Sequence, residues 1–182
     1  MSAIDRRVAL LRGINVGHAK RVAMADLRKL FEDLGYGDVR TLLNSGNVVF
    51  TVVRKSAGDE GARIEKAIAD RLGVTTRVTV LLRKEVAAAV REYPLGAIAD
   101  NPSRLLLMAL QDSKAVAQLK PLLKERWTPE ALALGKRVAY LWCANGIIDS
   151  RLWAAANRVV GDAGTARNLA TMTKLLALVE DP

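Results

Sequence analysis

The sequence has few of the residues that most often bind metal ions or carry nucleophilic catalysis. Its 182 residues include one cysteine, Cys143, and one histidine, His18, which lie far apart in the chain. A single cysteine excludes an internal disulfide, and ordinary zinc sites need several such ligands at short spacing. We therefore expect no metal site, and the cytoplasm is the predicted compartment.

Long apolar runs are also missing, and aromatic residues make up only 4% of the chain. No stretch reaches the roughly 18 uncharged apolar residues that a transmembrane helix needs. The residues before Val8 lack the apolar core and cleavage site of a signal peptide. We therefore expect neither a membrane span nor a secretory signal. With 51% hydrophobic residues, however, the chain has enough apolar surface to fold rather than stay disordered.

The net charge of +9 favours anionic partners, and two interpretations of it stay open. Residues 1–92 carry 17 Lys and Arg against 11 Asp and Glu, and residues 93–182 carry 11 against 8. Such an excess steers anions, nucleic acid included, but it is spread out and forms no run of like charges. The excess can equally be plain surface composition. Phe50 is the only aromatic residue in the predicted central strands, so any nucleic-acid binding is not expected to be sequence-specific.

The first half of the chain shows the residue pattern of a ferredoxin-like unit. Apolar periodicity and turn residues predict strand, helix, strand, strand, helix and strand over residues 8–11, 24–34, 39–43, 48–53, 59–72 and 76–82. This βαββαβ order gives an antiparallel sheet with both helices on one face.

The second half is predicted to repeat that order in part. We expect a helix over 84–92, a linker over 93–102, a strand over 104–110 and a helix over 113–125. Strands over 131–134 and 137–143 and helices over 151–160 and 166–179 follow. The predicted fold is therefore α+β, with a ferredoxin-like subdomain over 1–92 and a second, partly similar subdomain over 93–182 packed against it. The last helix has a wide apolar face, which can pack inside the chain or on a second copy, so the oligomeric state stays open.

The topology brings two polar, glycine-containing segments to one edge of the predicted sheet. In a ferredoxin-like unit the loop after the first strand lies beside the turn between the second and third strands. The candidate ligand-binding residues in these segments are Arg12, Gly13, Asn15, Gly17, Asn44, Ser45 and Asn47. Arginine, amide side chains and glycine-rich backbone together suit an anion, which predicts a phosphorylated or carboxylated, nucleotide-like small ligand. The alternative is that these residues only satisfy turn geometry.

No catalytic signature is present, so the sequence names neither a reaction nor a cofactor. The loop after the first strand is neither a Walker A motif nor a dinucleotide fingerprint. His18 has no carboxylate or nucleophile near it in sequence and is predicted to be an exposed loop residue. Cys143 lies in an apolar strand and is predicted to be a buried, inert thiol, and Trp142 in the same strand is predicted to lie in the core.

Three motifs resemble those of a known bacterial family. Residues 10–17 read LLRGINVG and are followed by Met24 and Leu27, and residues 44–50 read NSGNVVF. Residues 165–168 read TARN and precede Lys174 and Leu175. These motifs resemble the signature of the bacterial domain-of-unknown-function family 1697, over essentially the whole chain. The resemblance implies an α+β fold of two ferredoxin-like halves and no established activity.

The C-terminal motif adds Arg167 and Asn168 to the candidate ligand-binding residues, on the strength of the resemblance alone. This chain departs from the family pattern directly after them, because Leu169 and Ala170 stand where tryptophan and asparagine are usual.

Overall fold

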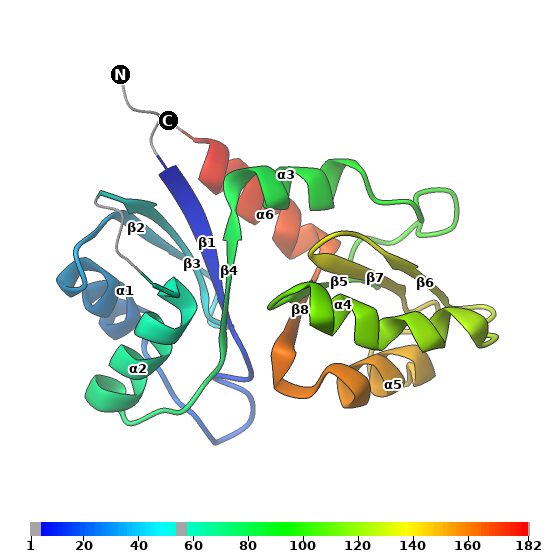
Figure 1. The fold of residues 1–182 in the computed structure, drawn as a ribbon, viewed down its shortest axis with the longest axis horizontal. Helices are drawn as coiled ribbons and strands as arrows, with labels where there is room; N and C mark the ends of the chain where they lie inside the picture. Colours follow the sequence, from blue (N-terminus) through cyan, green and yellow to red (C-terminus); the bar gives the residue numbers. More distant parts are fainter. Residues whose placement is uncertain (1–4, 54–57, 182) are drawn as a thin grey trace. The chain divides into compact units, whose positions relative to one another are not determined.

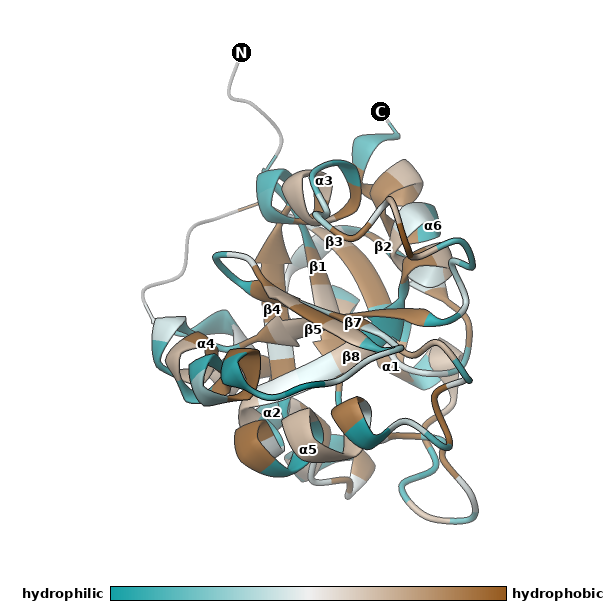
Figure 2. Cartoon of the chain, turned by 90° about the vertical axis from the view of Figure 1, so that its right-hand side faces the viewer, coloured by the Kyte–Doolittle hydropathy of each residue, from teal (hydrophilic) through white to brown (hydrophobic). Residues whose placement is uncertain are grey.

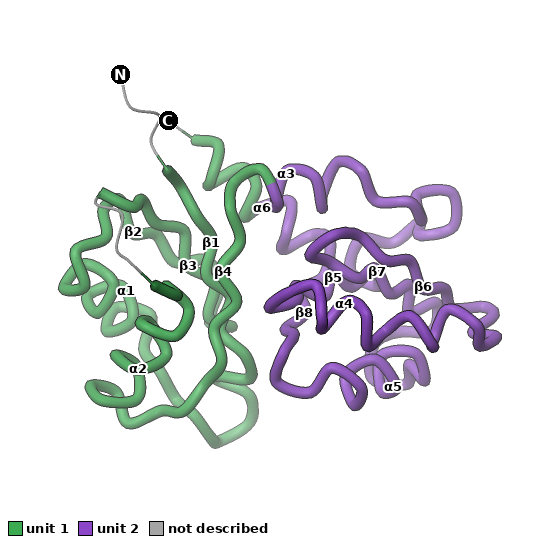
Figure 3. Tube along the Cα trace, viewed as in Figure 1, with its two compact units in different colours: residues 1–84, 175–182 green, residues 85–174 purple. Residues whose placement is uncertain are grey.

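The computed structural model describes residues 5–53 and 58–181 and divides the chain into two compact units. Unit 1 consists of residues 1–84 and 175–182, and unit 2 consists of residues 85–174 (Figure 3). Each unit contains a four-stranded antiparallel sheet (Figure 1). Residues 2–4, on which the expected absence of a signal peptide partly depends, lie outside the described residues.

Unit 1 has the predicted ferredoxin-like topology. Its elements are β1 (Asp5–Leu11), α1 (Met24–Asp33), β2 (Tyr36–Leu42), β3 (Asn47–Val52), α2 (Glu60–Leu72) and β4 (Val78–Leu82). The strand order is β2-β3-β1-β4, so the two central strands are β1 and β3. Their antiparallel register places Val8 opposite Val49 and Leu10 opposite Asn47.

Helices α1 and α2 bury their apolar faces against one side of this sheet. Leu27, Phe31 and Ile64 are each fully buried, and they pack in one cluster with Phe50 of β3. The rings of Phe31 and Phe50 meet edge to face with centroids 5.3 Å apart. Since the Phe50 ring lies in this core, the central strands of unit 1 offer no aromatic surface on which a base could stack.

Unit 2 repeats the same topology in full. It begins within α3 (Arg83–Arg91) and continues through β5 (Leu105–Leu110), α4 (Ser113–Leu119), β6 (Ala131–Leu134), β7 (Val138–Trp142), α5 (Arg151–Val160) and β8 (Gly164–Asn168). The strand order β6-β7-β5-β8 corresponds to that of unit 1. The central strands β5 and β7 are buried along their whole length and hydrophobic (Figure 2). The predicted α+β fold with two ferredoxin-like halves is thus confirmed.

Strand β8 corrects the predicted helix over 166–179, whose first three residues are extended. Ala166 pairs with Met108 and Asn168 with Leu106, so β8 is the neighbour of β5 on the side opposite β7. Because β5 is fully buried, its main-chain groups need partners on both sides, and this requirement outweighs the helix propensity of the segment. Helix α6 (Leu169–Glu180) begins directly after the strand.

The predicted helix over 113–125 is also shorter than expected. Helix α4 ends at Leu119, and the 3₁₀ helix η1 (Lys120–Lys124) continues the chain. Pro121 lies in the first turn of η1. Proline has no N–H to donate and clashes with the preceding helical turn, which ends the α-helix here.

Three further predictions concern the linker, the division into subdomains and the apolar face of the last helix. The segment 93–102, predicted as a linker, joins α3 to β5 inside unit 2. The predicted division into subdomains over residues 1–92 and 93–182 stays a prediction. The predicted apolar face of α6, made of Leu169, Met172, Leu175, Leu176 and Val179, is buried within the single chain. No helix among residues 5–53 and 58–181 is long and apolar enough to cross a membrane.

Candidate functional site

The loop between β1 and α1 lies beside the turn between β2 and β3, as the topology predicts. The main-chain N–H of Leu11 donates to the carbonyl oxygen of Gly46 at 2.9 Å. The side-chain Nδ2 of Asn15 donates to the carbonyl oxygen of Asn44 at 2.7 Å. The two candidate segments therefore form one edge of unit 1.

Asn15 closes the loop after β1. Its Nδ2 also donates to the carbonyl oxygen of Val22 at 2.8 Å, and its Oδ1 accepts from the Val22 N–H at 2.8 Å. Its own N–H donates to the carbonyl oxygen of Lys20 at 3.0 Å. The residue has a φ of +55°, a left-handed conformation that asparagine tolerates better than most residues. Asn15 therefore holds the frame of the loop.

Asn47 holds the turn between β2 and β3 in a similar way. It is fully buried, and its Nδ2 donates to the carbonyl oxygen of Leu42 at 2.8 Å and to Ser45 Oγ at 3.0 Å. Gly46, with a φ of +79°, lies so close to Leu11 that an added Cβ would be 2.7 Å from the Leu11 Cβ. Asn44 and Ser45 are exposed. A ligand-binding role of these residues stays a prediction.

Arg12 and its neighbouring glycines lie at the start of the same loop. The Arg12 N–H donates to the carbonyl oxygen of Arg77 at 2.9 Å, and its carbonyl oxygen accepts from Thr76 Oγ1 at 2.8 Å. Gly13 and Gly17 are exposed and have φ values of +62° and +60°. The backbone of Arg12 is thereby fixed at the edge of the sheet, while its role toward a ligand, like that of the two glycines, stays a prediction.

An open hollow of about 400 Å³ lies at this edge, next to the start of α1. We call it the α1 hollow. Its lining residues are Asn15, Arg21, Val22, Ala23, Met24 and Asn44. Two of the predicted residues, Asn15 and Asn44, thus line the hollow, and Arg21 joins them. Arg21 was not predicted from the sequence, because its place in the lining depends on how the loop folds back onto Asn15.

The start of α1 presents main-chain donors at this hollow. Ala23 occupies the N-cap position and has no side-chain acceptor, and the first helical bond runs from the Leu27 N–H to the Ala23 carbonyl oxygen at 3.0 Å. The N–H groups of Met24, Ala25 and Asp26 therefore have no acceptor within the helix. This end of the helix carries partial positive charge, and Asp26 in the first turn partly offsets it.

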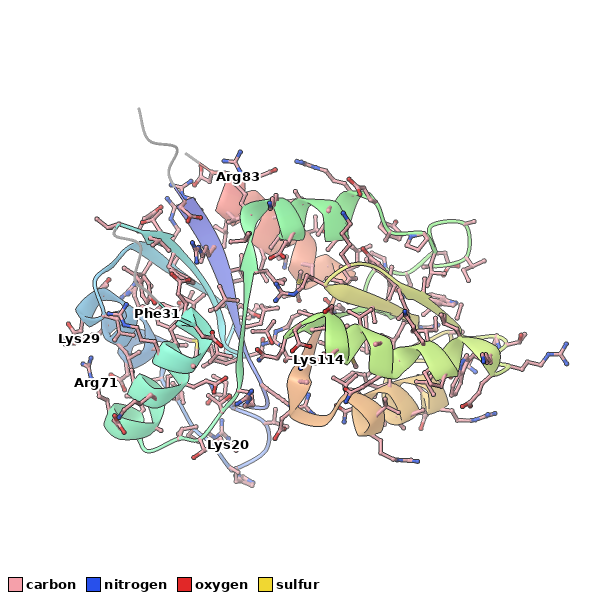
Figure 4. The ribbon with its side chains drawn as sticks, in the orientation of Figure 1. Lys20, Lys29, Phe31, Arg71, Arg83 and Lys114 are labelled. Atoms are coloured by element: carbon pink, nitrogen blue, oxygen red, sulfur yellow. The ribbon has the colours of Figure 1, made fainter. Side chains whose placement is uncertain are left out.

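Three basic or titratable side chains lie on the loop between β1 and α1, and one of them, Arg21, lines the hollow. His18, Lys20 and Arg21 are exposed. None of the three forms an ion pair with any residue in ranges 5–53 and 58–181. Lys20 lies on the loop between β1 and α1 (Figure 4). The prediction that His18 is an exposed loop residue is confirmed.

Arg167 and Asn168 belong to unit 2, whereas the α1 hollow belongs to unit 1. The Arg167 guanidinium is almost completely buried and donates to Thr165 Oγ1 at 3.0 Å and to the Ala166 carbonyl oxygen at 2.8 Å. Burial lowers the pKa of Arg167 to about 10. The Asn168 Oδ1 accepts from the Thr171 N–H at 2.9 Å, so this side chain caps the start of α6.

Neither a reactive thiol nor a metal-binding cluster occurs among the residues that the structure describes. Cys143 is buried, as predicted, and its burial raises the pKa of the thiol. A thiol of this kind is a poor nucleophile, because the thiolate is the reactive form. Within the described ranges, no three His, Cys, Asp or Glu side chains lie close enough together to hold a metal ion.

Similarity to known proteins places this architecture in a family. A family model described as a protein of unknown function, DUF1697, matches residues 4–140. The chain belongs to the DUF1697 family. The match includes the loop and turn around the α1 hollow. It ends at residue 140, so it does not cover the motif at residues 165–168.

A solved structure shares the fold of this DUF1697 protein along its whole length. The chain is similar to the conserved bacterial protein SP0830 from Streptococcus pneumoniae, with a TM-score of 0.76 and 22% sequence identity. The similarity covers 98% of this chain and 100% of that chain. At this identity the similarity shows the fold alone. No curated protein matches this chain in sequence.

Proposed function

We propose that this DUF1697 protein binds a phosphorylated or carboxylated small ligand in the α1 hollow. The observation that carries the proposal is Arg21 in the lining of the hollow, beside the uncapped start of α1. A guanidinium group and main-chain N–H groups at a helix start are donors that phosphate and carboxylate oxygens accept well. The nucleotide-like ligand predicted from the sequence belongs to this class.

The size and lining of the hollow support a small ligand. A volume of about 400 Å³ lies within the range of ordinary small-molecule sites. Val22, Ala23 and Met24 supply apolar side chains on which the uncharged part of such a ligand can pack. The charged part would then lie toward Arg21 and the first N–H groups of α1.

The frame of the hollow supports binding without a large ordering penalty. Asn15 is bonded to both sides of the site, to Val22 before the helix and to Asn44 in the neighbouring turn. A site that is already ordered loses less conformational entropy when the ligand binds. In this proposal Asn15 positions the loop, and the ligand contacts Arg21 and the helix start.

The test measures ligand affinity in a variant that lacks the guanidinium group. Inorganic phosphate, citrate and AMP are first screened for thermal stabilisation of the wild-type protein, and the best one is titrated by calorimetry. Arg21→Gln is expected to weaken that ligand by about tenfold or more, since a charge-assisted hydrogen bond is lost. Lys66→Gln is the matched control, because it removes one positive charge from the exposed face of α2.

Two results would contradict the proposal. One is a wild-type protein that none of the three anions stabilises at millimolar concentration. The other is an equal loss of affinity in Arg21→Gln and Lys66→Gln, which would mean that only the net charge matters. We propose no reaction, because none of the residues that line the hollow is a nucleophile or a general base. The single cysteine, held as a buried thiol, supports the cytoplasm as the compartment.

A further inference from the structure

The helix layers of the two units share one topology but differ in how their charges are paired. In unit 1, α1 and α2 carry Lys29, Lys66 and Arg71, which form ion pairs with Asp33 or Asp70. Lys29 and Arg71 are labelled in Figure 4. Together the two helices carry five Lys and Arg against six Asp and Glu, so the positive charges are balanced within this helix layer.

Unit 2 has no such balance on its helix layer. Residues 112–126 carry four Lys and Arg against two Asp and Glu, and residues 151–160 carry two Arg and no acidic residue. Asp112 is engaged as the N-cap of α4, where its carboxylate accepts from the Ala115 N–H at 2.9 Å. We define the basic helix face of unit 2 by six exposed residues: Lys114, Lys120, Lys124, Arg126, Arg151 and Arg158. None of the six forms an ion pair within residues 5–53 and 58–181.

Lys114 lies on α4, Arg151 and Arg158 lie on α5, Lys120 and Lys124 lie on η1, and Arg126 follows η1. Leu119 of α4 and Leu152 of α5 are buried in the same core cluster, which places both helices against the sheet of unit 2. Arg151 and Arg158 are seven residues apart, so they project from one side of α5 with their backbones about 10 Å apart. Lys114 lies near the start of α4 (Figure 4). The face therefore presents separated positive charges rather than one cation pocket.

We propose that the basic helix face of unit 2 binds the phosphate backbone of double-stranded nucleic acid. Several separated cations suit a polyanion with regularly spaced charges better than a single small anion. Stacking on single-stranded bases requires exposed aromatic rings. Every aromatic residue of the chain is at least partly buried, and the Trp127 Nε1 donates to the Leu122 carbonyl oxygen at 2.7 Å. The proposal is independent of the α1 hollow in unit 1.

The test compares two double variants with the same change in net charge. Binding of a mixed-sequence DNA duplex of about 20 base pairs to the full-length protein is followed by fluorescence anisotropy at several salt concentrations. Arg151→Gln with Arg158→Gln is expected to weaken binding by about tenfold at low salt and to reduce the salt slope by about two. Lys29→Gln with Lys66→Gln, on the helices of unit 1, is expected to change the affinity by less than about twofold.

The comparison separates a local surface from bulk charge and from other anionic partners. Equal weakening by both double variants would overturn the proposal, and so would the absence of duplex binding at low salt. Equal or tighter binding of one strand alone, or of vesicles that contain phosphatidylserine, would also overturn it. Circular dichroism melting of both variants must match the wild type. If the arginine pair fails this check, Lys114→Gln with Lys124→Gln replaces it, with the same expected result.

Discussion

The side-chain amide of Asn15 donates to the main-chain oxygen of Asn44 at 2.7 Å, which joins two loops 29 positions apart in the chain. The same amide group is also bonded to Val22 just before α1. One side chain therefore fixes the loop after β1, the turn after β2 and the approach to α1. All three border the α1 hollow, so its shape depends on this contact.

Replacement of Asn15 tests this structural role. Asn15→Ala removes three hydrogen bonds and places alanine at a φ of +55°, so we expect the free energy of unfolding to fall by about 2–4 kcal/mol. Asn44→Ala keeps the main-chain oxygen that Asn15 uses and is expected to change stability by less than about 0.5 kcal/mol. Urea unfolding of both variants measures the difference. Similar free energies of unfolding for the two variants would show that the Asn15 side chain does not hold the loop.

Close packing at Gly46 gives a second prediction. An added Cβ would be 2.7 Å from the Leu11 Cβ and 2.8 Å from the Ile14 Cδ1, in a backbone with a φ of +79°. Gly46→Ala should therefore destabilise the protein by about 2–4 kcal/mol through backbone strain and overpacking. At Gly17, where φ is +60° and nothing lies within 4 Å of an added Cβ, alanine should cost about 1 kcal/mol. Thermal melts that rank the two the other way would refute this account.

We expect Asp26 to compete with the proposed anionic ligand for the positive end of α1. The carboxylate lies in the first helical turn, so its neutralisation leaves that end free for the ligand. Asp26→Asn is expected to raise the affinity for the anion by about three- to fivefold, measured by calorimetry at low salt. The anion is the one whose affinity Arg21→Gln lowers. Asp70→Asn makes the same charge change on α2 and should leave the affinity unchanged within about twofold. An increase of equal size in both variants would assign the effect to net charge.

Alkaline pH should destabilise the fold partly through Cys143. Burial is the largest cause that raises the pKa of this thiol above its ordinary value of 9.0. The unfolded chain therefore loses the proton first, and stability present at neutral pH is lost as the pH rises above that value. The urea midpoint of the wild type should fall more steeply from about pH 8 to about pH 10 than that of Cys143→Ala.

The slope, rather than the absolute stability, is the informative quantity in that comparison. Burial also raises the pKa values of Tyr36 and Tyr140, and both tyrosines stay in the variant, so some alkaline loss remains. Parallel slopes for the wild type and the variant would show that the Cys143 thiol titrates alike in the folded and unfolded chains.

Local signals predicted most of the elements, and the failures have identifiable causes. The hairpin around residues 44–47 and the helix that ends at Gly73 were readable because turn glycines and apolar spacing act over a few residues. Strand β8 was not readable, because Ala166 and Arg167 are good helix formers and only the open edge of β5 makes them extended. Pro121 is a local signal for the end of α4 at Leu119, and the predicted helix over 113–125 did not take it into account.

The candidate site divides in the same way. Asn15 and Asn44 were predicted from topology, since a ferredoxin-like sheet places their two segments side by side. That the amide groups of Asn15 and Asn47 are occupied by the main chain follows only from the folded geometry. Arg21 lines the α1 hollow because the loop folds back through the Asn15 contact, which no local pattern shows.

The sequence by itself determined what the chain lacks: a disulfide framework, ordinary metal spacing and a long apolar run. It also determined the apolar periodicity that builds the ferredoxin-like halves, since these properties depend on composition and short-range spacing. Only the tertiary structure decided which positive charges are paired. Pairing between a cation and a carboxylate depends on which surfaces the fold brings together. Within residues 5–53 and 58–181, Lys29, Lys66 and Arg71 of unit 1 have carboxylate partners, and the six cations of the basic helix face of unit 2 form no ion pair.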